Sequence, residues 1–263
     1  MINVGELLMN LPERERRGSR PRCILLTDGS NEDVARRLST LVAPFAIIDS
    51  NHHWMPRGFA EPRESKLVDA PSFLSDERRE AITAWWLAVR ERANTPNWDI
   101  ASTATIDGTE GLLLVEAKAH TAEIKTDGKA AGGRAENHSH IGSACREASA
   151  ALNSVLPGWN LSIGSHYQLC NRFAWAWKLA SLGIPVVLVY LGFLHAEEMR
   201  DQGHPFTDAK QWERLLRGHS AGIVPAKIWD APILIDRTPL HAIIRAIAVP
   251  LDRNLTTHRR AAG

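Results

Sequence analysis

A carboxylate and an amine follow directly on one apolar run of the chain. The run from Gly111 to Val115 leads into Glu116, Ala117 and Lys118. An aliphatic run of this length, bounded by glycine, predicts a strand buried on both faces. Because side chains alternate along a strand, Glu116 and Lys118 share one face, ~7 Å apart for a rise of ~3.3 Å per residue. Charges at the end of a buried strand are unfavourable unless they are paired or bind a metal.

The segment before this strand brings in a second carboxylate. Residues 97–106 are rich in β-forming residues, and the dipeptide Asp107-Gly108 that follows is typical of a two-residue hairpin turn. With this dipeptide as the loop, counting back along both strands places Asp99 opposite Glu116; a loop that ran on to Gly111 would change this register. Residues directly opposite lie on one face with Cβ atoms ~5 Å apart. Two opposed carboxylates repel, and a divalent cation between them would remove the repulsion.

An aspartate, a turn and then Glu-Xaa-Lys at the end of an apolar strand resembles the PD-(D/E)xK nuclease superfamily. The matched part runs from about Asp99 to Phe193, roughly a third of the chain. Glu-Ala-Lys alone is common on helix surfaces, so the specificity comes from the aliphatic strand and the preceding aspartate. The family's usual proline before the aspartate is replaced by Trp98, with Pro96 just upstream.

The resemblance implies a metal-dependent DNA endonuclease that hydrolyses phosphodiester bonds, of the restriction, repair or defence type. Asp99 and Glu116, with the backbone carbonyl of Ala117, would bind Mg²⁺, for which Mn²⁺ can substitute. Lys118 would hold or help deprotonate the attacking water and stabilise the charge on the phosphate. A buried aspartate or glutamate paired with Lys118, without chemistry, is the alternative.

A helix predicted over residues 166–180 carries three polar residues in its first half. Gln168, Asn171 and Arg172 have the i, i+3, i+4 spacing that places them on one side of a helix. In the resembled family the helix after the Glu-Xaa-Lys strand brings polar residues to the active site. We assign Gln168 to orienting water or phosphate, and Asn171 and Arg172 to the substrate; hydrogen bonds to backbone carbonyls have nearly equal weight. The run 184–193 predicts a second buried strand.

Two flanking segments hold further candidates. Lys125 and Lys129 lie in a Gly- and Lys-rich loop, which suits contact with a phosphate backbone and equally suits an ordinary loop. A helix is predicted from Ser72 to Ala93, with Ser75 as its N-cap. By resemblance Glu80 on this helix is a candidate additional metal-binding acid, although a solvated glutamate paired with arginine is favoured.

Two other functional interpretations stay open. A member of the same fold could bind nucleic acid or act as a scaffold without cutting. An unrelated zinc-dependent α/β hydrolase could use His138 and His140, but we predict a helix over 136–152, where residues two apart diverge.

The elements predict an α/β protein with a restriction-endonuclease-like αβββαβ core, in which a mixed central sheet is flanked by helices. Residues 1–71 are expected to form an N-terminal α/β extension or subdomain, with strands at 23–27 and 45–49 around a helix that ends at Leu41. Residues 72–195 would be the nuclease-like core. Residues 196–263 would form a C-terminal α/β addition packed on it, with a helix at 208–217, a strand at 232–236 and an apolar stretch at 243–249.

Composition sets few further limits. The 263 residues carry a formal net charge of +1, which does not exclude a basic cleft for nucleic acid. The three cysteines, Cys23, Cys145 and Cys170, have no metal-binding spacing, and their odd number favours a reducing, cytoplasmic location. No apolar run reaches the length of a membrane span. DNA is the partner that the resemblance implies, membrane association is not expected, and a homodimer stays open.

Overall fold

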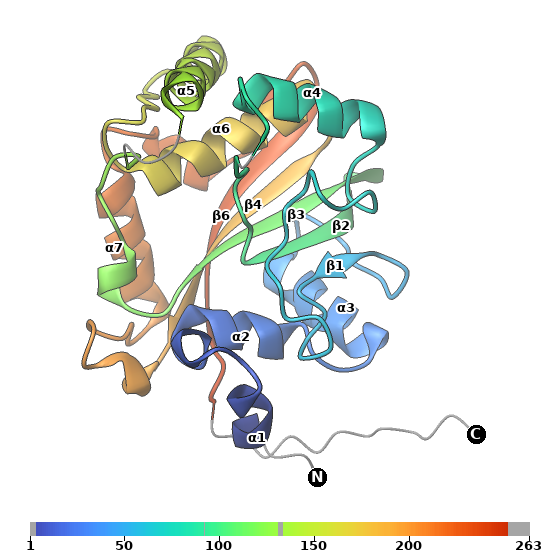
Figure 1. Ribbon diagram of the computed structural model, residues 1–263, viewed down its shortest axis with the longest axis vertical. Helices are drawn as coiled ribbons and strands as arrows, with labels where there is room; N and C mark the ends of the chain where they lie inside the picture. Colours follow the sequence, from blue (N-terminus) through green and yellow to red (C-terminus); the bar gives the residue numbers. More distant parts are fainter. Residues whose placement is uncertain (1–3, 92, 131–133, 252–263) are drawn as a thin grey trace.

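The chain is built around one six-stranded mixed sheet (Figure 1). The computed structural model describes residues 4–91, 93–130 and 134–251. From one edge of the sheet to the other, the strands are β1 (Trp54–Met55), β2 (Ile100–Ile106), β3 (Thr109–Lys118), β4 (Val186–Leu194), β6 (Thr238–Ala248) and β5 (Ile233–Ile235). The first three are antiparallel, β3, β4 and β6 are parallel, and β5 is antiparallel to β6. The predicted α/β class with a mixed sheet is confirmed.

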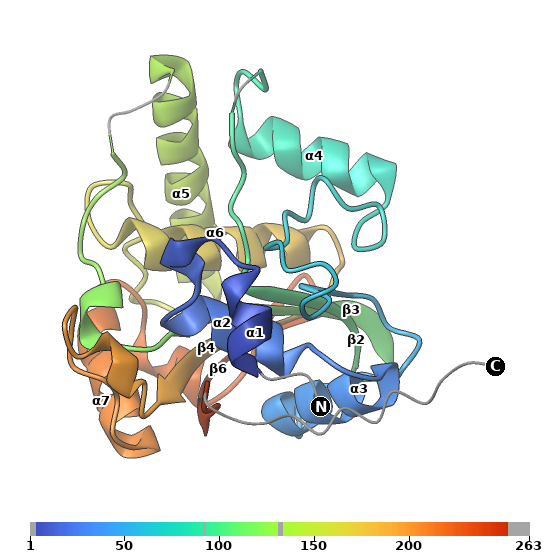
Figure 2. The same cartoon turned by 60° about the horizontal axis from the view of Figure 1, so that its bottom comes forward.

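Helices cover both faces of this sheet. Figure 2 shows α4, α5 and α6 on one side and α3 on the other. The helices are α1 (Val4–Met9), α2 (Ser19–Leu26), α3 (Asn31–Val42), α4 (Asp76–Trp86), α5 (Ala135–Val155), α6 (Tyr167–Ser181) and α7 (Ala209–Ser220), with 3-10 turns η1 (Glu13–Glu15), η2 (Thr121–Glu123), η3 (Glu197–Met199) and η4 (Ala226–Trp229). Within the described ranges, every helix falls short of the length or the hydropathy that a transmembrane span requires.

The alternation along β3 divides the core into two layers. Leu112 and Leu114 pack with α4 to α7, whereas Leu113, Val115 and Ala117 pack with α2 and α3. Glu116 and Lys118 continue the first of these two faces, which is the one that α6 covers. The period of the strand therefore directs both charged side chains towards α6.

The hairpin between β2 and β3 has the predicted turn. Asp107 and Gly108 both have positive φ, 49° and 78°, as a type I′ turn requires. The paired residues run from Ile106 opposite Thr109 to Ile100 opposite Val115. Continued by one residue, this register places Asp99 opposite Glu116. The loop does not extend to Gly111, and the predicted register is confirmed as far as Ile100 opposite Val115.

The N-terminal segment differs from the prediction. Residues 23–26 belong to helix α2 and are not a strand, and residues 45–49 contribute only an isolated bridge between Ile47 and Thr105. Helix α2 lies between the sheet and α1, so Cys23 and Leu26 pack on one side while Ile24 and Leu25 pack on the other. A short segment that is buried all round shows no periodicity, and an apolar run of this kind does not distinguish strand from helix.

The helix that follows is confirmed as predicted. Ser30 caps α3, and its side chain accepts a hydrogen bond from the backbone N–H of Asp33. Likewise Ser75 caps α4 by accepting from the N–H of Arg78, although α4 ends at Trp86, before the predicted Ala93.

The order of elements around the hairpin departs from αβββαβ. Between α4 and β4 the chain forms two strands and two helices, and the third antiparallel strand, β1, precedes α4. The C-terminal segment also enters the sheet, because β6 pairs with β4 from Val186 opposite Leu240 to Leu194 opposite Ala248. Within residues 196–251, part of the predicted C-terminal addition, strand β6 therefore belongs to the central sheet itself, and the helix predicted at 208–217 and the strand at 232–236 correspond to α7 and β5.

Candidate active site

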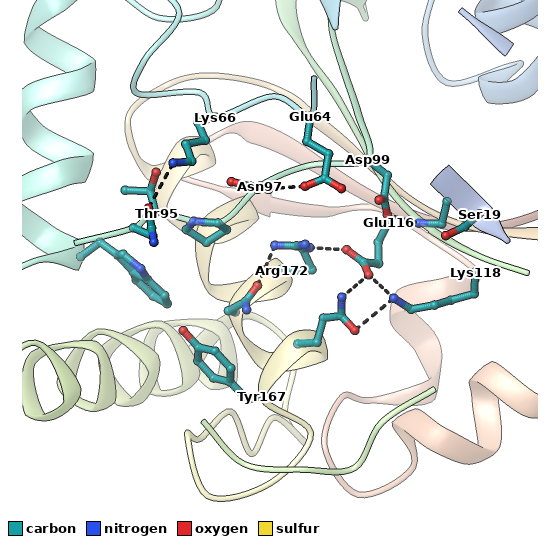
Figure 3. Close-up of a pocket in the computed structure, with 16 residues that line it drawn as sticks. Ser19, Glu64, Lys66, Thr95, Asn97, Asp99, Glu116, Lys118, Tyr167 and Arg172 are labelled. Atoms are coloured by element: carbon teal, nitrogen blue, oxygen red, sulfur yellow. Dashed lines mark hydrogen bonds and ion pairs between the residues drawn. The ribbon is translucent and has the colours of Figure 1, made fainter. Parts of the chain in front are cut away.

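Asp99, Glu116 and Lys118 meet at the end of the β2–β3 hairpin (Figure 3). Asp99 lies just before β2, and its Oδ2 accepts a hydrogen bond from the backbone N–H of Ala117 at 2.7 Å. In an antiparallel pair, the N–H and C=O of one residue point to the same neighbouring strand. The carbonyl of Ala117 therefore points to the same side of β3 as its N–H, the side on which Asp99 lies.

Glu116 is the centre of a hydrogen-bond network. Its side chain is only 1% exposed, and its Oε1 accepts from Lys118 Nζ and, at 2.5 Å, from Gln168 Nε2. Its Oε2 accepts from Arg172 Nε at 2.6 Å. Lys118 Nζ also donates to Gln168 Oε1 at 3.0 Å. A buried carboxylate needs such partners, and here they come from its own strand and from α6.

Helix α6 supplies three of the predicted residues because its first turns run beside the end of β3. Arg172 Nη1 donates to Asn171 Oδ1 at 3.0 Å, and the guanidinium lies 4.6 Å from the centroid of the Trp98 ring. Trp98 stands where the resembled family has proline, and its buried ring holds Arg172 by a cation–π contact. Gln168 and Arg172 therefore both bond to Glu116, whereas Asn171 bonds to Arg172.

The pKa values in the site diverge. Burial and the neighbouring charge of Glu116 raise the pKa of Asp99 to about 7. Burial alone would raise the pKa of Glu116, but Arg172 and Lys118 outweigh burial and lower it. Burial would lower the pKa of Lys118, but Glu116 and Asp99 raise it above its usual value. Glu116 is thus an anion, Lys118 a cation, and Asp99 the group that titrates near neutral pH.

These groups line one end of a cavity of about 660 Å³. Its walls come from α2, the loop before α4, the end of α4, the loop before β2, the end of β3, and α6. The lining residues are Ser19, Glu64, Lys66, Trp86, Asn94, Thr95, Pro96, Asn97, Asp99, Glu116, Ala117, Lys118, Tyr167, Gln168, Asn171 and Arg172.

The donor atoms suit a hard cation with few protein ligands. In the described part of the chain, no three His, Cys, Asp or Glu side chains form a metal-binding cluster. Two carboxylates and one carbonyl form a set that Mg²⁺ accepts, because it retains several waters. The raised pKa of Asp99 shows that its negative charge is poorly compensated, which a cation beside it would correct. Such a cation would share Glu116 with Lys118 and Arg172.

Other predicted residues lie at varying distances from this network. Lys125 is exposed and lines a small cavity shared with Lys118, and Lys129 Nζ lies 5.8 Å from the ring centroid of Tyr167. Glu80 does not line the cavity: it pairs with Arg90 on the surface of α4 and lines a neighbouring groove, which shares Lys66 and Thr95 with the cavity.

The two histidines of the zinc interpretation lie on α5, as the helix prediction required. His140 Nε2 is 3.1 Å from the carbonyl oxygen of Ala84, and neither His138 nor His140 lines the cavity of Asp99 and Glu116.

The sequence interpretation missed three residues near the site. Glu64 lines the cavity and accepts from Asn97 Nδ2 at 2.8 Å, and it comes from a loop that carries no pattern. Glu123 in η2 accepts from the N–H of Ala119. Tyr190 stands opposite Glu116 on β4, with a buried hydroxyl that has no hydrogen-bond partner among the described residues. Of these three residues, only Tyr190 could have been found from the sequence, because the two apolar runs predict parallel strands that pair with each other.

The chain was compared with protein-family models, with curated proteins and with solved structures. No protein-family model, no curated protein and no solved structure matches it. The arrangement of Asp99, Glu116 and Lys118 is therefore the observation from which a function is inferred.

Proposed function

We propose that this protein is a metal-dependent nuclease that hydrolyses phosphodiester bonds in DNA. The observation that carries the proposal is the convergence of Asp99, Glu116 and Lys118 from two paired strands at one end of a cavity. This is the constellation that the PD-(D/E)xK resemblance implies, and the restriction-endonuclease-like fold is part of the same proposal. The antiparallel hairpin followed by a parallel strand, β4, is compatible with that fold.

Asp99, Glu116 and the carbonyl of Ala117 would hold Mg²⁺. When bound, the ion supplies Lewis acidity and a water of lowered pKa. With a divalent cation in place, the charges of Lys118 and Arg172 leave the site positive, even with both carboxylates ionised. A positive, half-buried site favours a phosphodiester over a neutral substrate.

Lys118 acts as a cation in this proposal. Its pKa is raised by Glu116 and Asp99, so the ammonium keeps its proton at neutral pH. Its hydrogen bonds to Glu116 and Gln168 fix the position of Nζ at the cavity wall. From there it stabilises the negative charge that develops on the phosphate, in preference to taking a proton from water.

Arg172 and Gln168 position Glu116. Both donate to its carboxylate, and Arg172 is held in turn by the ring of Trp98. The guanidinium would restrict Glu116 to one orientation towards Asp99. Direct contact of Arg172 with phosphate stays a prediction.

A plasmid-nicking assay tests the proposal. Wild-type protein should convert supercoiled to nicked or linear DNA in Mg²⁺ or Mn²⁺ and not in EDTA. Asp99→Asn, Glu116→Gln and Lys118→Met should each reduce the initial rate of cleavage by about 10²-fold or more. Glu80→Gln is the matched control, because Glu80 also pairs with an arginine but lies outside the cavity. Cleavage by Glu116→Gln at the wild-type rate would reject the site.

One observation favours a second function, DNA binding without cleavage. Both oxygens of Glu116 are bonded to side chains, two of them cationic, so the carboxylate is already neutralised. In that case wild-type protein would bind DNA equally well in Mg²⁺ and EDTA and would nick nothing. The same assay, run beside a mobility-shift assay, decides between the two.

A further inference from the structure

The cavity extends well beyond the charged cluster that the mechanism uses. Figure 3 shows Lys66, Thr95 and Tyr167 away from the end that holds Asp99 and Lys118. These three residues come from the loop before α4, the loop before β2 and the start of α6. None of them has a role in the proposed chemistry.

A polar group in this far wall lacks a partner. Thr95 is only 7% exposed, and its Oγ1 has no hydrogen bond in the described part of the chain. Leaving a buried hydroxyl unpaired costs about 1–3 kcal/mol. Thr95 lines the cavity, so a turn of its side chain towards a bound ligand would give this hydroxyl its missing hydrogen bond.

A cation in the same wall is uncompensated. Lys66 Nζ donates to Asn94 Oδ1 at 3.1 Å, and no described carboxylate lies within 4.0 Å of it. Arg63, three residues earlier, is paired with Glu61 at 2.6 Å. Lys66 is thus available to an anionic group of a ligand that enters the cavity.

The size and lining of the cavity fit a nucleotide. Its volume of about 660 Å³ lies within the range of about 300–1,000 Å³ found for small-molecule sites, whereas a DNA duplex is far larger. Tyr167 offers an aromatic ring of the kind on which bases stack. Asn94, Asn171 and Thr95 offer amide and hydroxyl groups that can bond the edge of an unpaired base.

We propose that the far end of the cavity binds an unpaired nucleotide next to the scissile phosphate, which would lie at the end of the cavity that contains Asp99, Glu116 and Lys118. The substrate is then single-stranded DNA, or a single-stranded tail on a duplex, and Lys66 contacts the phosphate of the neighbouring nucleotide. The cleavage part of this inference rests on the proposed nuclease function. The binding part does not, because Lys66, Thr95 and Tyr167 are separate from the chemistry.

Thr95→Val tests the pocket, since valine keeps the shape of threonine and removes the hydroxyl. Because that hydroxyl has no partner, the melting temperature should stay the same or rise slightly. Affinity for a short fluorescein-labelled single strand, measured by anisotropy in EDTA, should fall about threefold to tenfold. Ser65→Ala is the matched control: Ser65 also has a buried, unpartnered hydroxyl, but it does not line this cavity. It should bind like wild type.

The same strand, its blunt duplex and a tailed duplex are then incubated with protein in Mg²⁺. The expected result is binding and cleavage of the single strand and the tail about tenfold or more in preference to the blunt duplex. If the blunt duplex is bound and cut equally well and Thr95→Val matches Ser65→Ala, the pocket inference is wrong and the nuclease proposal stands. If the single strand is bound selectively, with loss in Thr95→Val, but nothing is cut, the nuclease proposal is wrong and the pocket stands. If nothing is bound or cut, both are wrong.

Discussion

Two buried arginines in this protein pair with glutamate, and their surroundings differ. Arg172 pairs with Glu116 under the cavity, and Arg22 of α2 pairs with Glu198 of η3 on the other side of the sheet. Arg22 is 2% exposed and Arg172 is 6% exposed, so both cations need a partner. The ion pair itself therefore does not distinguish a functional glutamate from a structural one.

The distinction lies in the other groups around each carboxylate. Glu198 accepts from Arg22 Nη2 at 3.0 Å and from the N–H of Gly18 at 3.2 Å, which ties η3 to the start of α2. Glu116 stands next to a second carboxylate, Asp99, whose pKa is raised to about 7 by burial and by Glu116. Repulsion that a structure retains between two acids beside a cavity is characteristic of a functional site.

The largest expected difference between the two pairs is in catalysis. Glu116→Gln should reduce cleavage of DNA by about 10²–10³-fold, because it removes one of the two charged ligands of the metal. Glu198→Gln should leave cleavage within about twofold and lower the stability by about 1–3 kcal/mol, since Arg22 loses its partner. Initial rates and urea denaturation of both variants measure this. Equal rates for the two variants would contradict the functional assignment of Glu116.

Removing either arginine should lower the stability, but only the loss at Arg172 should depend on Mg²⁺. In EDTA, Arg172→Gln should lose about 3–5 kcal/mol, because Glu116 is left buried with less compensation. Mg²⁺ should restore part of this loss, since a cation between Asp99 and Glu116 replaces the missing charge. Arg22→Gln, the control, should lose stability without any such recovery. Thermal melts of both variants at increasing Mg²⁺ concentration test this. A gain in melting temperature of equal size in Arg172→Gln and Arg22→Gln would argue against a metal at Glu116.

The pH dependence of stability should have opposite signs in the two regions. The pKa of Asp99 rises from 3.8 to about 7 on folding, so its contribution to stability is present at low pH and is lost as pH rises through about 7. In EDTA, Asp99→Asn should therefore gain stability relative to wild type as pH rises from about 4 to about 7, by about 1–2 kcal/mol for this half-buried group.

Glu198 provides the contrasting case. Burial would raise its pKa, but Arg22 outweighs burial and holds the pKa below the ordinary 4.5, so its contribution is present above that value and is lost as pH falls through the lowered pKa. The deficit of Glu198→Gln should thus be full at pH 7 and shrink in acid. Denaturation curves at several pH values decide this, and parallel trends for the two variants would remove the distinction between the regions.

The difference between the regions also shows what the sequence could predict. The hairpin, its register and the meeting of Asp99 with Glu116 follow from local rules: a two-residue turn and a period of two. The i, i+3, i+4 spacing on α6 likewise predicted that Gln168 and Arg172 lie on one side. Each of these parts of the site follows from a local pattern in the sequence.

The remaining parts depend on tertiary contacts that leave no local pattern. Helix α2 is buried between the sheet and α1, so residues 23–26 have no polar face and were interpreted as a strand. Strand β6 enters the sheet beside β4 from residues far away in the chain. Lys66 and Thr95 lie in loops, and only packing brings them to the wall of the cavity.

The smallest expected effect concerns Lys66 and the salt dependence of DNA binding. If Lys66 contacts a phosphate, Lys66→Met should reduce the magnitude of the slope of log K against log salt by about 0.7 for a single strand. Arg17→Met is the control from the other region, because Arg17 is bonded to Asp201 and to the carbonyl of Glu198. Its slope should equal that of wild type.

A change in slope is more informative here than a change in affinity. Loss of packing around Lys66, or of its bond to Asn94, would weaken binding by a similar factor at every salt concentration. Only the loss of a phosphate contact reduces the number of counterions released on binding and so changes the slope. Anisotropy titrations at several salt concentrations separate these cases. An unchanged slope with weaker binding would make Lys66 a structural residue and would shift the phosphate contact to another cation, such as Lys125 or Lys129.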